Sequence, residues 1–192
     1  MQKRRVKQMW WGLALTAVLA LVAVILMPKS EPAAAQQTAP PALGVICTSD
    51  AGPNPTFTLT THTGYIGTPD DNTIFMWGYS EGSTPFQHPG PVLCVNEGDT
   101  VTIILQNTLN EDVSIVFPGQ DNVQANGEPA QPQFDTGGKL TSLTNVAPAN
   151  GGSVTYSFVA NHPGTFLYQS GTNPAIQVRM GLFGGMIVRP AL

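Results

Sequence analysis

Short hydrophobic segments separated by Gly, Pro, Asn and Asp recur along this chain of 192 residues after position 50. In most of them apolar or β-branched residues alternate with polar ones, which is typical of β-strands with one buried face. No helical period follows residue 27, and roughly 150 residues are enough to bury a core. The pattern therefore predicts an all-β sandwich or barrel. Strands are expected over residues 56–61, 73–79, 92–95, 101–105, 113–117, 153–158, 166–168 and 185–188.

The N-terminal region predicts a membrane anchor. An uncharged run of nineteen residues extends from Met9 to Met27, and four basic residues precede it. As a helix the run would span roughly 28 Å, about one bilayer core. Because basic flanks stay in the cytoplasm, we expect residues 1–8 to be cytoplasmic and residues 9–27 to form one transmembrane helix of a bacterial cytoplasmic membrane. The rest of the chain would then be extracytoplasmic. The alternative is a signal peptide cleaved after Ala35.

A linker and an acidic domain follow. Residues 28–42 are rich in Pro, Ala and Gln, which predicts a semi-extended linker. The globular domain is expected over residues 43–192. From Gln36 onward the chain has three basic and eleven acidic residues, a formal charge of −8. Such an acidic domain is a poor partner for nucleic acid or for an anionic membrane surface.

Several motifs, in order, carry a family resemblance. They include Met76-Trp77-Gly78-Tyr79, the segment from Val95 to Val101 and the segment from Pro163 to Ser170, and the chain closes with Gly184-Gly185-Met186-Ile187-Val188. This order resembles a cupredoxin domain of the multicopper oxidase and copper nitrite reductase kind, over about residues 55–190. The resemblance implies a Greek-key cupredoxin-like β-sandwich with copper ligands on the loops at one end.

The positions that match the family's copper ligands carry other residues. Where the family has His, Cys or Met, this chain has Val116, Pro118, Gln169, Ser170, Gln177 and Leu182. Val, Pro and Leu offer no ligand atom, and Gln and Ser bind copper poorly compared with imidazole and thiolate. The resemblance therefore implies a scaffold with replaced ligands, and we expect no copper cofactor.

Copper at another site is the alternative for the cofactor. Three histidines remain, none with metal-ligand spacing to another: His62, His88 and His162. Solvent-facing loop positions are the simpler interpretation for them. A site built by folding would join these histidines to soft thioether ligands, for which Met76, Met180 and Met186 are the candidates.

The two cysteines of the chain predict a covalent cross-link. Cys47 and Cys94 are the only cysteines, and an extracytoplasmic compartment predicts that they form a disulfide. Two free thiols are the alternative.

The replaced-ligand end of the sandwich would carry apolar residues, which we expect to form a surface for a partner protein. These residues are Val116, Phe117, Pro118 and Leu182.

The functional hypothesis follows from these replacements. No catalytic motif for hydrolysis or phosphoryl transfer occurs, and no carboxylate pair stands out. We therefore expect a membrane-anchored, non-catalytic accessory or structural subunit, not an enzyme, bound to another membrane-associated protein. The alternative is a copper-binding redox protein, or a component of a multicopper oxidase, that uses a site outside the family positions. A carbohydrate- or cell-wall-binding sandwich ranks last, because no aromatic platform supports it.

Overall fold

The computed structural model describes residues 47–49 and 52–191. In this part of the chain the strands are β1 (Cys47–Thr48), β2 (Thr56–Gly67), β3 (Thr73–Glu81), β4 (Val92–Asn96), β5 (Thr100–Gln106), β6 (Gln124–Ala125), β7 (Glu128–Pro129), β8 (Gln133–Phe134), β9 (Leu140–Ser142), β10 (Ser153–Val159), β11 (Gly164–Gln169) and β12 (Phe183–Arg189). One short helix, α2 (Pro174–Met180), precedes β12.

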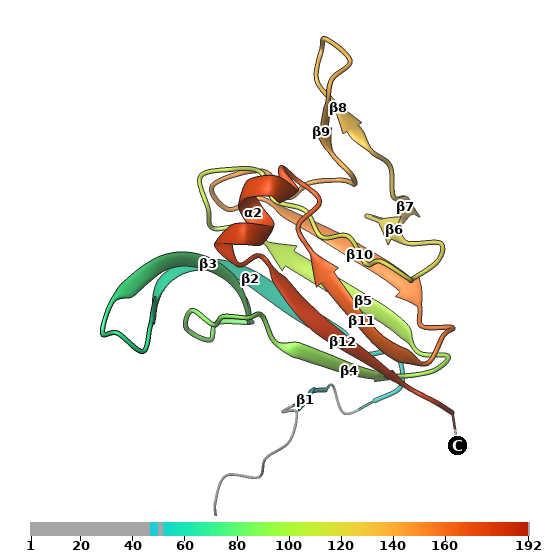
Figure 1. Ribbon diagram of the computed structural model, residues 1–192. Helices are drawn as coiled ribbons and strands as arrows, with labels where there is room; N and C mark the ends of the chain where they lie inside the picture. Colours follow the sequence, from blue (N-terminus) through green and yellow to red (C-terminus); the bar gives the residue numbers. More distant parts are fainter. Residues whose placement is uncertain (1–46, 50–51, 192) are drawn as a thin grey trace, which may run out of the picture. The chain divides into compact units, whose positions relative to one another are not determined.

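Two sheets form the body of the domain (Figure 1). Among the described strands, the first sheet has the order β1-β4-β12-β11 and the second the order β3-β2-β5-β10-β6-β7. Neighbouring strands are parallel at β1–β4, β4–β12 and β2–β5 and antiparallel elsewhere in these two sheets. Strands β8 and β9 form a separate antiparallel hairpin. The predicted β-sandwich is therefore confirmed.

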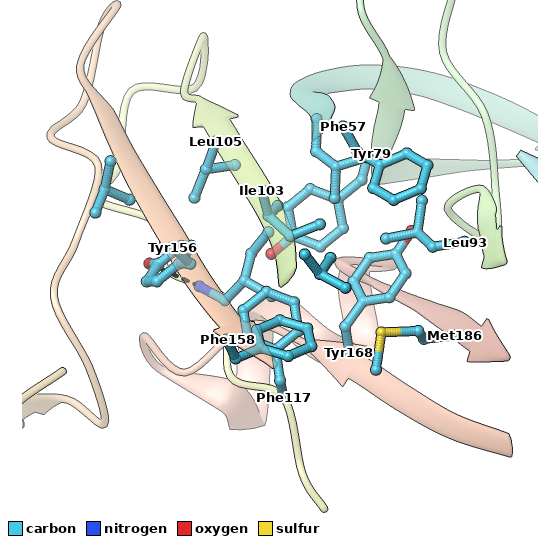
Figure 2. Packing of buried hydrophobic residues seen from close by; sticks show 14 of the residues in the cluster. Phe57, Tyr79, Leu93, Ile103, Leu105, Phe117, Tyr156, Phe158, Tyr168 and Met186 are labelled. Carbon is cyan, nitrogen blue, oxygen red and sulfur yellow. Dashed lines mark hydrogen bonds between the residues drawn. The ribbon is translucent and has the colours of Figure 1, made fainter. Parts of the chain in front are cut away.

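Alternation along the strands builds the core (Figure 2). In β5 and β10 every second residue is buried, and the register places buried residues opposite each other, as Ile103 opposite Tyr156 shows. Strand β12 has the same pattern, with Met186 and Val188 buried. Because side chains alternate between the two faces of a strand, this spacing aims one face of each sheet at the other.

Three buried tyrosines tie the sheets to the loops. Tyr79 donates a hydrogen bond to the carbonyl of Ser114 at 3.1 Å, and Tyr168 donates to the carbonyl of Pro91 at 2.7 Å. Tyr168 lies over Gly184, where an added Cβ would be 2.2 Å from the phenol oxygen. A glycine is therefore required at this position of the closing strand. Burial raises the pKa of Tyr79, Tyr156 and Tyr168.

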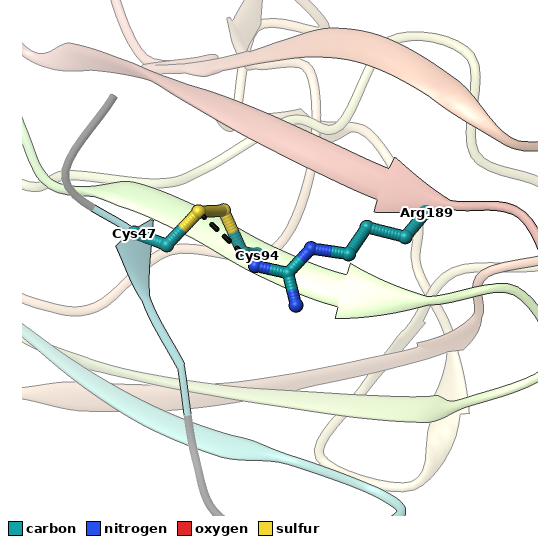
Figure 3. The surroundings of a disulfide bond; sticks show 3 residues. All are labelled: Cys47, Cys94 and Arg189. Atoms are coloured by element: carbon teal, nitrogen blue, oxygen red, sulfur yellow. Dashed lines mark hydrogen bonds between the residues drawn. A yellow bond between two sulfur atoms is a disulfide. The ribbon is translucent and has the colours of Figure 1, made fainter. Parts of the chain in front are cut away.

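The predicted disulfide is present (Figure 3). Cys47 and Cys94 are bonded, with their Cα atoms 5.4 Å apart. The bond fastens β1 to β4, and Leu93 and Val95 on either side of Cys94 belong to the hydrophobic core. Nη2 of Arg189 donates to Sγ of Cys47 at 3.4 Å.

Some expectations about secondary structure were wrong. Residues 113–117 form no strand; isolated bridges hold this segment, Val113 to Ala147 and Val116 to Gln169. Helix α2 interrupts the closing region, where no helical period was recognised. It is only seven residues long, too short to show a period. Pro174 lies at its start and Gly181, with φ of 116°, ends it.

The predicted cytoplasmic segment (residues 1–8), the anchor (residues 9–27) and the whole linker (residues 28–42) lie outside the described residues. Among the residues that the structure does describe, no helix has the length and apolar character needed to cross a membrane.

Candidate functional site

The replaced-ligand positions lie together at one end of the sandwich. The backbone of Val116 and the backbone of Gln169 exchange hydrogen bonds of 2.8 and 3.2 Å. The amide of Ser170 donates to the carbonyl of Leu182, and the amide of Leu182 donates to the carbonyl of Gln177. The fold thus brings together segments that are more than fifty residues apart in the sequence.

A buried hydrogen-bonded pair occupies the centre of this end. Oγ of Ser170 donates to Oε1 of Gln177 at 2.6 Å, and Nε2 of Gln177 donates to the carbonyl of Asp112 at 2.9 Å. Oγ of Ser170 also accepts from the amide of Thr172 at 3.1 Å. Gln177 is only 1% exposed and Ser170 is fully buried. These side chains are therefore engaged in holding the loop between β11 and α2.

A second set of hydroxyl groups lies beside this pair. The hydroxyls of Ser114 and Ser142 are 2.9 Å apart, and Oγ1 of Thr172 lies 2.9 and 3.0 Å from them. Ser114 and Ser142 are buried. The sequence does not predict a role for these three residues, because single Ser and Thr residues in separate segments carry no local signal. Together the two sets form what we call the hydroxyl network: Ser114, Ser142, Ser170, Thr172 and Gln177.

This end does not form the apolar partner surface that the sequence predicts. Phe117 is 4% exposed and Leu182 is fully buried, and both belong to the core. Phe117 packs against the rings of Phe158 and Tyr156, with centroids 4.9 and 5.7 Å away. Pro118 is exposed and Val116 is half-buried. The four residues therefore do not share an exposed patch, because the inward-facing aromatic residues of β10 cover Phe117.

The residues at the family's ligand positions do not fit copper. The set contains no imidazole, thiolate or thioether, which are the ligands that copper favours. Its two buried polar side chains, Ser170 and Gln177, are already hydrogen-bonded to each other. In the described residues, moreover, no three His, Cys, Asp or Glu side chains gather as a metal site. We therefore derive no chemical step through a metal at this end, and the expected absence of copper from the whole protein stays a prediction.

The three histidines occupy separate elements. His62 lies on β2, opposite Gly78 of β3. His88 lies before β4, and its ring meets the ring of Phe183 edge-on at 5.5 Å. His162 is exposed and its Nε2 lies 3.2 Å from Oδ2 of Asp121. Nε2 of His62 and Nδ1 of His88 are buried without a hydrogen-bond partner among the described residues.

The three candidate methionines among the described residues differ in burial. Met186 is fully buried in the hydrophobic core and is unavailable as a ligand. Met76 of β3 and Met180 at the end of α2 are half-buried. Met76 lies two residues from Gly78, the cross-strand partner of His62, so it shares a face of the β2–β3 ribbon with that histidine.

Comparisons with known proteins decide the family. A family model described as multicopper oxidase matches residues 83–192, more than half of the chain. The chain belongs to the multicopper oxidase family. An L-ascorbate oxidase of Cucurbita maxima is 33% identical over 123 residues, which are 64% of this chain and 18% of that protein. The copper resistance protein A of Escherichia coli is 31% identical over 100 residues, 52% of this chain and 14% of that protein.

Solved structures agree on the fold. A copper nitrite reductase from Nitrosomonas europaea superposes with a TM-score of 0.51 at 23% identity, covering 76% of this chain and 42% of that one. This likeness confirms the cupredoxin-like sandwich. The chain spans less than a fifth of the length of the two curated relatives named above.

The comparisons also correct the prediction that the chain is not an enzyme. The matching family model is that of an oxidase, and the relatives include named oxidases. That prediction came from six replaced residues in one domain. Replaced ligands describe that end of the domain and do not define the class of protein to which the chain belongs.

Proposed function

We propose that this chain works as a cupredoxin domain of a multicopper oxidase-type redox assembly, with the copper held outside the family positions of this domain. One observation carries the proposal: the cupredoxin-like sandwich is kept, while the side chains of Ser170 and Gln177 at the ligand end are buried and hydrogen-bonded to each other. Such a domain contributes structure and interfaces to an oxidase whose metal is bound by other domains or chains.

The lengths of the relatives support the proposal that other domains or chains bind the copper. The matched region is 18% of the ascorbate oxidase and 14% of the copper resistance protein. Most of each relative therefore has no counterpart in this chain, and an oxidase built with this domain needs further copper-bearing parts.

The proposal includes a location. The run from Met9 to Met27 and the basic residues before it favour a single-pass anchor, with the domain outside a bacterial cytoplasmic membrane. Confinement to a membrane raises the effective concentration of neighbouring membrane-associated proteins. The partner that we propose is therefore another membrane-associated, copper-bearing protein.

Gentle extraction of the tag-free protein with its partners tests the proposal. Copper content and oxygen consumption with an electron donor are measured on the co-purified assembly and on the chain alone. We expect copper and oxidase activity in the assembly, well below one copper per isolated chain, and loss of activity when the chain is removed. An assembly without copper, or full activity without the chain, would contradict the proposal.

A second candidate is a copper site of the chain's own, centred on His62 or His88. The observation that favours it is the buried, unpartnered ring nitrogen in each of them, since buried polar atoms normally have a partner. In this case the isolated chain would retain stoichiometric copper after dialysis against a chelator. His62→Ala or His88→Ala would abolish that binding, whereas His162→Ala, the control at an exposed histidine, would not.

A further inference from the structure

A two-stranded ribbon projects from the sandwich (Figure 1). Strand β2 pairs with β5 only over Thr56–Thr60, and β3 lies at the edge of its sheet. Beyond that point, residues 63–67 and 73–77 pair with each other and, in the described structure, with no other strand. We call these two segments and the turn between them the arm.

The outer part of the arm is apolar. Tyr65 and Phe75 lie opposite each other with ring centroids 5.5 Å apart, and Tyr65 is 68% exposed. Ile66 and Ile74 form the next pair on the other face, and Ile74 is also exposed. Exposed aromatic residues on an unprotected edge are typical of a surface that binds another protein.

The tip of the arm is acidic. Asp70 and Asp71 are both exposed in the turn between β2 and β3. Hydrogen bonds from Thr68 and then from Asn72 lower the pKa of Asp70. The tip therefore carries negative charge at neutral pH.

A groove of about 490 Å³ lies at the ligand end of the domain, between the β8–β9 hairpin and the loop that leads into α2. Lys139, Leu140, Leu143 and Pro174 are among its lining residues, and Leu140 and Leu143 are exposed. Phe134, 61% exposed, pairs with Leu140 on the same hairpin. The groove thus has apolar walls and a cation.

Among the described residues, the cation of the groove has no ion-pair partner. Lys139, Arg179 and Arg189 are the basic residues from Gln36 onward. Across residues 47–49 and 52–191, none of them lies within ion-pair distance of a carboxylate. Asp135 also lines the groove, but its Oδ1 accepts hydrogen bonds from the backbone amides of Gly137 and Lys139.

We propose that the arm of one copy of this chain docks into the groove of a second copy. The two surfaces are complementary, because Tyr65 and Phe75 would meet Leu140 and Leu143 while the acidic tip would meet Lys139. The residues that line the groove include none from the arm of the same chain, and the arm and the β8–β9 hairpin project in different directions (Figure 1). The acidic charge of the rest of the domain disfavours docking of this tip away from its three basic residues, and of these Lys139 is the one that lines the groove.

The contact joins two different surfaces, so it is heterologous. Repeated head-to-tail contacts of this type close into a ring or extend as a filament. The inference goes beyond the redox role proposed above and does not depend on copper. It concerns how copies of the chain assemble.

Self-association of the full-length chain in detergent tests the docking, measured by sedimentation equilibrium over a range of concentrations with the detergent density-matched. We expect a concentration-dependent oligomer. Tyr65→Ser with Phe75→Ser should weaken the association about tenfold or more, since buried aromatic anchors dominate interfaces. Val159→Ser with Leu167→Ser removes two other exposed apolar side chains and should leave the association unchanged.

The charged contact has its own test. Lys139→Gln and Asp71→Asn should each weaken the association, and the double variant should lose less than the sum of the two, because the variants remove one shared interaction. Asn tolerates the positive φ of 62° at position 71. Carbodiimide coupling of mixed ¹⁴N- and ¹⁵N-labelled chains should join Lys139 of one copy to Asp70 or Asp71 of another.

Four results would overturn the inference. The first is a monomer at every concentration, and the second is an oligomer that the arm variants leave unchanged although they unfold at the same temperature as the parent. The third is coupling of Lys139 only to carboxylates outside the arm, or only within one isotopic chain. The fourth is that the arm variants no longer bind a different membrane protein although their self-association is intact, which would assign the arm to that partner.

Discussion

Replacing Gln177 by Leu should destabilise the domain, because its amide joins two buried groups. The substitution conserves approximate size and removes the acceptor of Ser170 and the donor to the carbonyl of Asp112. Ser170 keeps a second acceptor, the carbonyl of Thr172 at 3.1 Å. The carbonyl of Asp112 gains no replacement from the leucine. Leaving one buried acceptor unpaired costs about 1–3 kcal/mol, so we expect a loss of about 2 kcal/mol.

This loss is measurable by thermal unfolding of the full-length chain. For a domain of roughly 150 residues, 2 kcal/mol corresponds to a fall of about 4–8 °C in Tm. Ser170→Ala should cost about 1–2 kcal/mol, because it leaves Oε1 of Gln177 and the amide of Thr172 without their partner. The double variant should cost about 1 kcal/mol less than the sum, since the interaction between the two side chains is then counted once.

Gln169→Leu is the matched control. Gln169 is half-buried, next to Ser170 in the chain, and among the described residues its side chain makes no hydrogen bond. The same chemical change there should alter stability by less than about 0.5 kcal/mol. Equal Tm values for Gln177→Leu and Gln169→Leu, or strict additivity in the double variant, would refute the view that the Ser170–Gln177 pair holds this end together.

Four further predictions concern the rest of the chain. Burial stabilises the neutral form of three phenols, so their contribution to stability is fully present below pH about 10 and is lost as pH rises through their raised pKa values. Ultraviolet titration of the folded protein should therefore show no ionisation of them near pH 10, only on alkaline unfolding; they are Tyr79, Tyr156 and Tyr168. Replacing Cys47 and Cys94 by Ser opens a loop with a sequence separation of 47 and should cost up to about 4 kcal/mol in chemical denaturation; two alkylatable thiols in the unreduced wild type would contradict the pairing. Phe117→Ala should cost about 3–5 kcal/mol because it empties a packed core position, and an unchanged Tm would show that the side chain is not buried. Protein from membranes should begin near its own N-terminus and require detergent, whereas a soluble species that starts at Gln36 would indicate a cleaved signal.

The sequence was sufficient for the parts of the fold that depend on local alternation. Val101, Ile103 and Leu105 of β5 are buried, whereas Thr102 and Ile104 between them are only half-buried, and the same period in β10 makes the two strands match. Such patterns identify the buried face without knowledge of the partner strand. The disulfide also follows from local information, because the chain has only two cysteines and the predicted compartment is oxidising.

The burial of the ligand end could not be predicted in this way. Phe117 and Leu182 are apolar residues beside loops, and their exposure depends on segments distant in the sequence. The ring of Phe158, 41 residues along the chain, covers Phe117, and Ser170 pairs with Leu182 through the backbone. Local patterns of apolar and polar residues do not specify which of two distant segments will meet.

The same limit explains the missed helix and the missed hydroxyl network. A local signal for α2 was available, because Pro174 and Gly181 bracket seven residues in the order expected of a helix start and end. No comparable signal exists for Ser114, Ser142 and Thr172, which come from three separate segments. Short polar side chains are ordinary in loops, and only the fold brings these three hydroxyls together.

The two surfaces of the domain should therefore respond to substitution in separable ways. Ser170 and Gln177 are buried, so their replacement should change the free energy of unfolding without changing association. Tyr65 and Phe75 are exposed on a ribbon, so their replacement should change association with little effect on unfolding. Because Lys139 of the groove belongs to a hairpin outside the core, Lys139→Gln should behave as the arm variants do. A groove variant that lowered Tm as much as Gln177→Leu would instead show that the hairpin is part of the folded core.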